Sequence, residues 1–219
     1  TFYTFLFIIV LFLCSIGSRN KRPNIESTNV NLLRKQTPTN ESPPMFLSLV
    51  LIPPKDSRIK IQNQIDRLAE GRGPSFPAHV TIVGGIPCQS EARADEIALE
   101  LEEGLKGFGK VPCSFSSTPK FFRDTWNQAL IFTMDITDRF VALCETSRIL
   151  MNLPHECAYP PPVNLPHTSL FYGVSNIPDE TEVEPISPFD AYEVALWNTT
   201  PSTLDGVTDW KEIAIIGLL

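Results

Sequence analysis

Two stretches of the sequence repeat one pattern: Pro77-Ala78-His79-Val80-Thr81-Ile82-Val83-Gly84-Gly85 and Leu165-Pro166-His167-Thr168-Ser169-Leu170-Phe171-Tyr172-Gly173. In each, proline precedes a histidine, a hydroxyl residue follows two positions later, and apolar residues lead to glycine. The histidines stand 88 positions apart (79 to 167) in a chain with 3 histidines in all. Side chains at i and i+2 of a strand share a face, so each motif is expected to present an imidazole beside a hydroxyl.

Two such strands lying together would gather two imidazoles and two hydroxyls. A neutral imidazole can take a proton from water while a protonated one gives a proton to a leaving oxygen, and histidine supplies both forms near neutrality. Hydroxyl and backbone N–H groups can hold the oxygens on which charge develops. The pattern therefore predicts cleavage of a phosphodiester by water, with no metal and no cofactor.

Hydrophobic spacing around the motifs predicts an α+β fold. The expected helices cover 56–70, with an Asp or Ser cap, 90–105, with Ser90 as cap, and 137–153, which would bury Phe140, Val141, Cys144, Ile149 and Leu150. The expected strands cover 46–52, 79–83 (ending at Gly84-Gly85), 111–122, 129–136, 168–172, 192–198 and 210–218. The runs 111–122 and 129–136 are expected to form a hairpin, and the element order favours antiparallel pairing.

The N-terminal part differs from the rest of the chain. Residues 1–17 carry no charge and are mostly Phe, Leu, Ile and Val, and the basic stretch 18–22 follows directly. This composition predicts either a cleaved signal peptide or a membrane anchor, and an artefactual segment is the third alternative. The first two place the protein in the secretory pathway or tether it to a membrane, whereas the third leaves it cytoplasmic. Residues 18–44 have the composition of a disordered linker, and the domain is expected over 45–219.

The charge distribution limits the partners. Residues 1–44 hold five basic and two acidic side chains, whereas residues 45–219 hold thirteen basic and twenty-three acidic ones. An acidic domain repels the phosphates of a nucleic-acid duplex, so a duplex-binding surface is not expected. A small phosphorylated ligand in a local pocket remains compatible with this charge.

The paired motifs resemble those of the two-histidine (2H) phosphoesterase superfamily, and the opening stretch Ser48-Leu49-Val50-Leu51-Ile52-Pro53-Pro54 and the closing strand fit as well. The resemblance implies a bilobal α+β fold, with two antiparallel sheets flanked by helices around a central cleft. The stretch 167–172 is most similar to the cyclic phosphodiesterases of plants and fungi. For this subgroup we expect hydrolysis of ADP-ribose 1″,2″-cyclic phosphate to ADP-ribose 1″-phosphate and of nucleoside 2′,3′-cyclic phosphates to 2′-phosphates.

The resemblance also implies roles for single residues. His79 and His167 would form the acid–base pair, Thr81 and Ser169 would bind the phosphate, and Tyr172 would lie near it. His167 would activate water and His79 would protonate the leaving group, although the reverse reaction exchanges these roles.

The subgroup often has Trp in the first strand for base stacking, where this chain has Val50. Phe121, Phe122 or Trp126 could substitute for it. The N-terminal leader is a second departure from the subgroup. ADP-ribose 1″,2″-cyclic phosphate is a by-product of tRNA splicing, and such by-products are handled in the cytosol and nucleus.

Two alternative functions stay open. One is a two-histidine phosphodiesterase acting on RNA ends, by 2′,5′ cleavage or 3′-end trimming. The other is a lumenal domain of the same fold that binds a ligand without turnover. In all cases we expect a monomer.

Several other residues are predicted to be structural. His155 is expected at a helix end, and Trp197 and Trp210 in the core. The acidic stretch 179–184 is expected to be a solvated loop, because it lacks the spacing of a calcium-binding loop. The five cysteines, Cys14, Cys88, Cys113, Cys144 and Cys157, have no zinc-ligand spacing and predict either buried thiols or disulfides of undetermined pairing.

Overall fold

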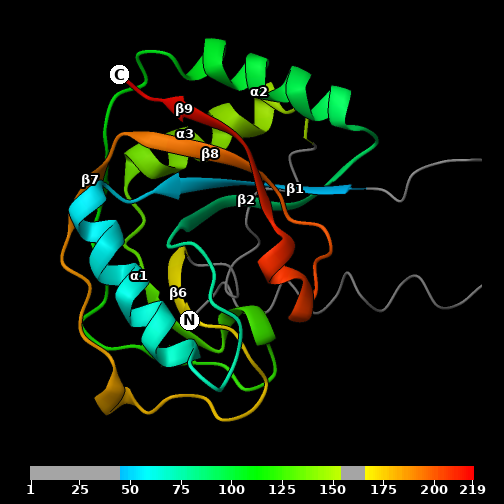
Figure 1. The fold of residues 1–219 in the computed structure, drawn as a ribbon. Coiled ribbons are helices and arrows are strands. Elements are labelled where there is room, and N and C mark those ends of the chain that lie inside the picture. Colours follow the sequence, from blue (N-terminus) through cyan, green and yellow to red (C-terminus); the bar gives the residue numbers. More distant parts are fainter. Residues whose placement is uncertain (1–44, 154–165) are drawn as a thin grey trace, which may run out of the picture. The chain divides into compact units, whose positions relative to one another are not determined.

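The computed structural model describes residues 45–153 and 166–219, and within them the predicted α+β class is confirmed (Figure 1). Antiparallel strands form a four-stranded sheet in the order β2-β1-β8-β9, a three-stranded sheet β4-β5-β6 and a two-stranded sheet β3-β7. The strands are β1 (Met45–Ile52), β2 (Val80–Cys88), β3 (Val111–Cys113), β4 (Lys120–Phe121), β5 (Leu130–Thr133), β6 (His167–Phe171), β7 (Phe189–Ala191), β8 (Glu193–Asn198) and β9 (Lys211–Gly217). The helices are α1 (Lys55–Ala69), α2 (Glu91–Leu105) and α3 (Asp138–Leu150), with short 3-10 turns η1 (Trp126–Gln128), η3 (Glu180–Glu182) and η4 (Asp205–Asp209).

The repeated sequence pattern corresponds to a repeated structural unit. β1, α1 and β2 form one strand–helix–strand unit, and β5, α3 and β6 form a second, with the two strands of each unit paired antiparallel. The helices are exchanged, because α1 contacts β6 and α3 contacts β2. Figure 1 shows α1 lying beside β6. Each histidine motif thus belongs to a strand that is covered by the other unit's helix.

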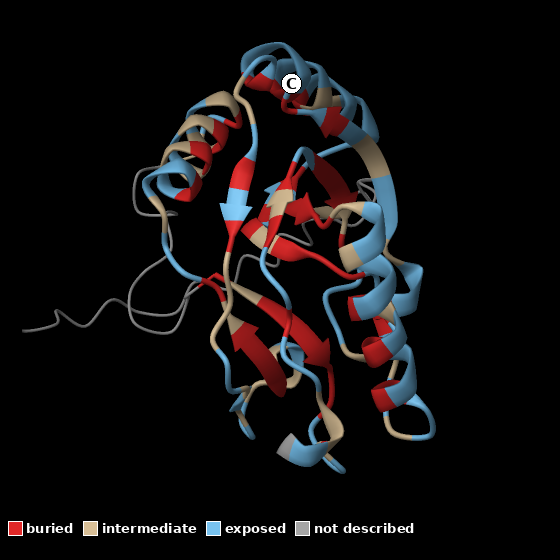
Figure 2. Ribbon diagram, turned by 90° about the vertical axis from the view of Figure 1, so that its left-hand side faces the viewer, coloured by how far each residue is buried: buried red, intermediate tan, exposed pale blue. Residues whose placement is uncertain are grey.

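The two faces of β1 have different surroundings. Leu47, Leu49 and Leu51 are fully buried in the main core, which also takes in the apolar sides of the three helices. Val50 belongs to a second, small cluster with Ala195 and Trp197 on the neighbouring strand β8. Figure 2 shows that buried residues concentrate on the strands and on the inward sides of the helices. The face of β1 that carries Ser48 and Val50 is therefore directed away from the main core.

The helix predictions are right in position and partly wrong in detail. Ser90 caps α2 as expected, its Oγ accepting a hydrogen bond from Arg93 N at 3.2 Å. The predicted cap of α1 is wrong: Pro54 occupies that position without any side-chain hydrogen bond, since its fixed φ suits a helix start. On α3, Val141 and Ile149 are 39% and 67% exposed, contrary to the expected burial. Phe140, Leu143 and Ser147 form its buried side instead.

Two strand predictions need correction. β2 does not end at Gly84-Gly85 but continues to Cys88, because the glycines accommodate an irregularity in its pairing with β1, with Gly85 at φ 70°. The run 111–122 is not one strand. Its first part, β3, pairs with the unpredicted β7. The expected hairpin with the run 129–136 is formed by β4, which pairs with β5, and by an isolated bridge between Phe115 and Met134. Ser116 and Pro119 lie in the interruption, where the Ser116 hydroxyl bonds the Thr118 carbonyl.

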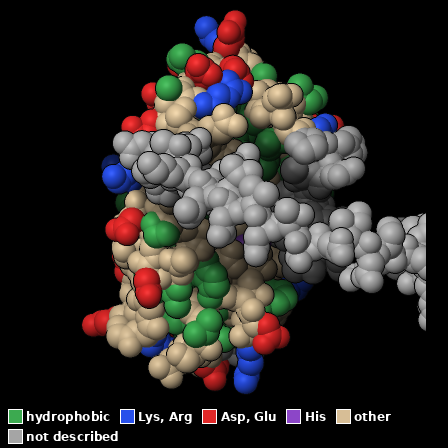
Figure 3. Space-filling view, turned by 90° about the vertical axis from the view of Figure 1, so that its right-hand side faces the viewer, with side chains coloured by type: hydrophobic (Ala, Val, Ile, Leu, Met, Phe, Trp, Pro, Cys, Tyr) green, Lys and Arg blue, Asp and Glu red, His purple; other side chains and the backbone are tan. Residues whose placement is uncertain are grey.

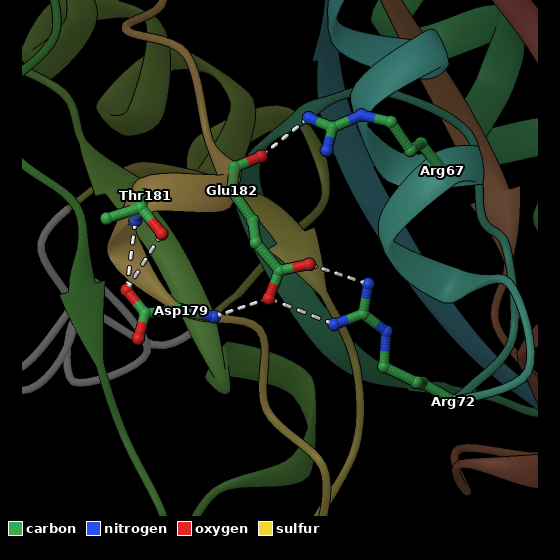
Figure 4. A network of polar contacts seen from close by, with 5 residues as sticks. All are labelled: Arg67, Arg72, Asp179, Thr181 and Glu182. Atoms are coloured by element: carbon green, nitrogen blue, oxygen red, sulfur yellow. Dashed lines mark hydrogen bonds and ion pairs between the residues drawn. The ribbon is translucent and has the colours of Figure 1, made fainter.

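The acidic stretch 179–184 is largely exposed, with Asp179, Thr181 and Glu184 at the surface, as expected of a solvated loop. The short turn η3 and the contacts of Glu182 anchor it to the rest of the domain (Figure 4). Glu182 accepts two hydrogen bonds from the Arg72 guanidinium, at 3.2 and 2.9 Å, and one from Asp179 N at 2.8 Å. Arg67 donates to the Glu182 carbonyl at 2.6 Å. Such two-point pairing fixes geometry as well as charge. We call these contacts of Glu182 with Arg67, Arg72 and Asp179 the Glu182 clasp, and they tie the segment after β6 to α1 and the turn that follows it.

Several predictions concern residues outside the described ranges. The leader 1–17, the linker 18–44 and His155 are among them, so they stay predictions. None of the helices in 45–153 and 166–219 is long and apolar enough to cross a membrane. Over the same ranges, no group of three or more His, Cys, Asp or Glu could hold a metal ion. Cys88, Cys113 and Cys144 are free thiols.

The Glu182 clasp predicts an acid-dependent stability. Its hydrogen bond to Arg72 lowers the pKa of Glu182 from 4.5 to about 2, so the clasp contributes fully above pH 4.5 and is lost as the pH falls toward 2. Replacing Glu182 by Gln should lower the melting temperature at pH 7, and the difference from wild type should shrink toward pH 2. Thermal unfolding at several pH values measures this. Glu96→Gln, which removes an exposed pair with Arg93, is the control and should have a smaller effect.

Gly73 predicts a local steric requirement. A Cβ at this position would lie 2.5 Å from the Tyr172 backbone carbonyl oxygen, which cannot rotate away as a side chain could. Gly73→Ala should therefore destabilise the fold by about 1–3 kcal/mol, as overpacking does. Gly217→Ala, where the added Cβ would meet nothing within 4 Å, is the matched control. Equal unfolding free energies of the two variants in urea would contradict the close packing of Gly73 against Tyr172.

Candidate active site

His79 lies directly before β2 and is buried, with 6% of its surface exposed. Its Nδ1 lies 2.6 Å from the Pro77 carbonyl oxygen, and because a carbonyl only accepts, Nδ1 carries the proton. The Trp197 ring meets the imidazole edge-on, with ring centroids 4.9 Å apart. The contact with Pro77 fixes the ring orientation and leaves Nε2 as the nitrogen that can exchange a proton.

His79 opens into a cavity of about 300 Å³ between the four-stranded sheet and the segment that follows β6. The cavity is lined by Ser48, Val50, His79, Thr81, Gly84, Gly85, Trp126, Asn127, Tyr172, Trp197, Thr199, Ser202 and Trp210. Four of these residues were candidates from the sequence, namely His79, Thr81, Tyr172 and Trp126. No Lys or Arg is among the lining residues that the structure describes, so polar contacts here come from histidine, hydroxyl, amide and backbone groups.

His167 is the first residue of β6 and is partly buried. It is not among the described lining residues of the cavity. The strand β6 contacts β2, so the two motifs lie in neighbouring parts of the fold. The pKa of His79 is lowered from 6.5 to about 4, mainly because burial disfavours the charged imidazolium. The hydrogen bond to Pro77 opposes this shift, and the neighbouring charge of His167 adds to it. His79 is therefore neutral at pH 7.

Tyr172 forms part of the cavity wall, and Ser169 lies behind it. Ser169 is buried and donates from Oγ to the Asn127 carbonyl at 3.1 Å, and it is not one of the described lining residues. Tyr172 stacks on Phe76 at a centroid distance of 3.6 Å and meets Trp126 and Trp210 edge-on. Burial raises the pKa of the Tyr172 phenol, which is therefore protonated throughout the physiological range.

Sequence reasoning missed three hydroxyl residues of the cavity, Ser48, Thr199 and Ser202. Thr199 Oγ1 donates to the Phe46 carbonyl at 3.2 Å, and the Ser48 hydroxyl lies 3.1 Å from Thr199 Oγ1. Alternation in β1 was the available signal, because Ser48 lies between the core residues Leu47 and Leu49 and must face the other side.

Trp197 belongs to the small buried cluster on β1 and β8, as expected of a core residue, and Trp210 packs against that cluster, but their place in the cavity was not expected. Trp197 is buried, at 4% exposure, but both indoles line the cavity. The sheet face that they occupy is not packed against a helix of the main core. Trp197 pairs with Ser48 across β1 and β8, next to Val50, so it offers an aromatic surface where the first strand lacks one. Of Phe121, Phe122 and Trp126, Trp126 is the one that lines this cavity.

Comparison with known proteins identifies the fold. The sequence matches no protein-family model and no curated protein. Among solved structures, TT0787 of Thermus thermophilus is similar with a TM-score of 0.57 at 14% identity, over 80% of this chain and 98% of that one.

E. coli LigT in its apo form gives a TM-score of 0.54 at 13% identity, over 81% of this chain and 99% of LigT. LigT complexed with 3′-AMP gives 0.51 at 15% identity, over 80% and 98%. These likenesses do not distinguish the plant and fungal subgroup, which remains a prediction. They confirm that the chain has the bilobal fold of the two-histidine phosphoesterases.

Proposed function

We propose that the protein is a metal-independent cyclic phosphodiesterase, which hydrolyses ADP-ribose 1″,2″-cyclic phosphate to ADP-ribose 1″-phosphate and nucleoside 2′,3′-cyclic phosphates to 2′-phosphates. The observation that carries this proposal is the buried His79, oriented by Pro77 and open to a small cavity near His167. The similar fold of LigT, which has been solved with phosphate and with 3′-AMP, supports a phosphorylated nucleotide as the ligand.

The lowered pKa of His79 favours the role of general base. With a pKa of about 4, roughly one molecule in a thousand would carry a protonated His79 at pH 7. A neutral imidazole with Nδ1 protonated can accept a proton at Nε2. We therefore assign His79 to proton abstraction from water and His167 to protonation of the leaving oxygen. This is the reverse of the assignment that the family resemblance implies.

The hydrolysis step balances with these two groups. Water attacks the phosphorus and gives a proton to His79 Nε2, while the bond from phosphorus to one ring oxygen breaks and that oxygen takes a proton from His167. The negative phosphate, bound between the imidazoles, offsets the repulsion that His167 exerts on a protonated His79. The two histidines would then exchange a proton through solvent to regain the starting state.

The charge of the cavity favours a diester over a monoester. A cyclic phosphodiester carries one negative charge, whereas a monoester product approaches two near neutral pH. With hydroxyl and amide groups such as Thr81 and Asn127 at the wall and no Lys or Arg among the described lining residues, little would compensate the second charge. We infer that the monoester product is released readily.

The base assignment predicts a specific titration. In the NMR spectrum of the free protein, the His79 ring should titrate with a pKa near 4. Inorganic phosphate should raise this pKa, because a nearby anion favours the imidazolium. His167→Gln should also raise it by removing the like charge, and His79→Gln assigns the resonance. A free-protein His79 that titrates at or above 6.5 would contradict its role as base.

The activity itself is tested with the full chain in EDTA. Wild type should hydrolyse ADP-ribose 1″,2″-cyclic phosphate and 2′,3′-cyclic AMP, and His79→Ala and His167→Ala should each lose about 10²- to 10⁴-fold in kcat. The acidic limb of kcat/KM should fall as the pH drops through about 4, because His79 must be neutral in the free enzyme. Ser202→Ala is the control. It removes a lining hydroxyl with no assigned role in the reaction, so its kcat shows how much a general change of the cavity wall lowers the activity.

Three outcomes separate the alternatives. No turnover of either cyclic phosphate by the folded wild-type chain would exclude the cyclic phosphodiesterase. Turnover of short oligonucleotides instead would support a phosphodiesterase of RNA ends. Ligand binding without any product would support a binding domain.

A further inference from the structure

A second, larger cavity lies beside the candidate active site, between the β4 end of the hairpin and the segment that follows β6. Its volume is about 570 Å³, against about 300 Å³ for the cavity that contains His79. It is lined by Phe121, Arg123, Val174, Ser175, Asn176 and Ile177, together with Pro178 and Asp179. None of these residues lines the first cavity, so the proposed reaction leaves this cavity unexplained.

The two cavities are lined by neighbouring residues of the same two segments. In one segment, Trp126 lines the first cavity and Arg123 the second; in the other, Tyr172 lines the first and Val174 the second. A hydrogen bond of 2.9 Å from Gly173 N to the Trp126 carbonyl joins the two segments. Because two residues span at most about 7 Å of chain, the linings at Tyr172 and Val174 lie next to each other. A ligand of two nucleoside units is long enough to contact both linings.

The lining of the second cavity has the composition of a nucleotide site. Phe121 is 39% exposed and Val174 66% exposed, so both apolar side chains are accessible to a ligand. An aromatic face can stack on a base, and the Arg123 guanidinium can bind phosphate oxygens through two N–H groups. Figure 3 shows one face of the molecule, on which hydrophobic side chains gather in its lower part.

The wall of this cavity is preformed by the Glu182 clasp. Asp179 lines the cavity, its backbone N–H is held by Glu182, and its carboxylate accepts from Thr181 N at 3.0 Å. Glu182 in turn is held by the two N–H groups of Arg72. Ordering this segment in advance reduces the entropy that a ligand must overcome on binding.

We propose that this second cavity binds a nucleoside phosphate unit attached to the scissile group, with Arg123 on the linking phosphate and Phe121 against the base. This inference rests on the proposed function, because it assigns the distal half of the same substrate. It makes the preferred substrate one with two units, such as ADP-ribose 1″,2″-cyclic phosphate, in which a pyrophosphate connects the cyclic phosphate ribose to adenosine. A single nucleoside 2′,3′-cyclic phosphate would leave the second cavity empty.

The test compares substrates of one and two units on the full chain. For each variant, kcat/KM is measured with 2′,3′-cyclic AMP, with ADP-ribose 1″,2″-cyclic phosphate and with an adenosine dinucleotide that ends in a 2′,3′-cyclic phosphate. Arg123→Gln and Phe121→Ala should each lower the ratio of a two-unit substrate to 2′,3′-cyclic AMP by about tenfold, the scale of one charge-assisted contact or one stacked base. Lys120→Gln removes an exposed positive charge on β4 outside the cavity and should keep the wild-type ratio.

Each outcome decides the proposal. If the variants lower the kcat/KM ratio for ADP-ribose 1″,2″-cyclic phosphate alone, the second cavity binds an adenosine that is linked through a pyrophosphate. If they lower the ratio for the dinucleotide alone, it binds a nucleoside that is linked through a phosphodiester. An unchanged ratio with both, in an enzyme that turns over all three, overturns the second site and leaves the phosphodiesterase intact.

The second site is also testable without turnover. Calorimetry with ADP-ribose on the same variants gives the dissociation constants, and weaker binding by about tenfold in Arg123→Gln but not in Lys120→Gln supports the site. Equal binding in both variants overturns it, whatever the activity of the chain.

Discussion

The exchange of helices between the two strand–helix–strand units is the packing on which the rest of this structure depends. Each histidine strand pairs with the first strand of its own unit, but α1 covers β6 and α3 covers β2. Apolar residues of α1, such as Ile61 and Ile65, therefore join one core with Leu47 and Leu49 of the four-stranded sheet. Since neither unit can bury its histidine strand without the other, the site at their junction is expected to form only when the whole domain folds.

This packing explains which parts of the fold the sequence could predict. Local patterns were sufficient for β1, whose Leu47, Leu49 and Leu51 alternate, and for α2, whose Ser90 cap is in place. Partners distant in sequence were not predictable in the same way. β3 pairs with β7 across 78 positions (from 111 to 189), and nothing in the short stretch Phe189–Ala191 indicates a strand. The sequence analysis also assigned two exposed residues of α3, Val141 and Ile149, to the core. Which side of α3 is buried depends on its contact with β2, a strand of the other unit, and the sequence of α3 does not contain this information.

In the candidate site, too, local sequence patterns predicted some features and did not predict those that depend on distant parts of the chain. The repeated motif predicted that His79 and His167 approach each other, because periodicity and repetition are local properties. The aromatic wall was not predictable, because Trp197 and Trp210 look like core residues until the sheet face that lacks a helix is known. Similarly, Glu182 lies in a run of acidic residues that suggests solvent, and only the position of Arg72 at the end of α1 explains its two-point contact.

The two motifs are alike in sequence but not in environment. His79 is enclosed by Phe76 and Trp197, whereas His167 at the start of β6 is only partly buried. Conversely, Thr81 lines the cavity while Ser169 is directed to the Asn127 carbonyl. Two imidazoles in identical surroundings would compete for one proton without preference. Burial lowers the pKa of His79, and this shift is the reason that we propose His79 as the base and His167 as the acid.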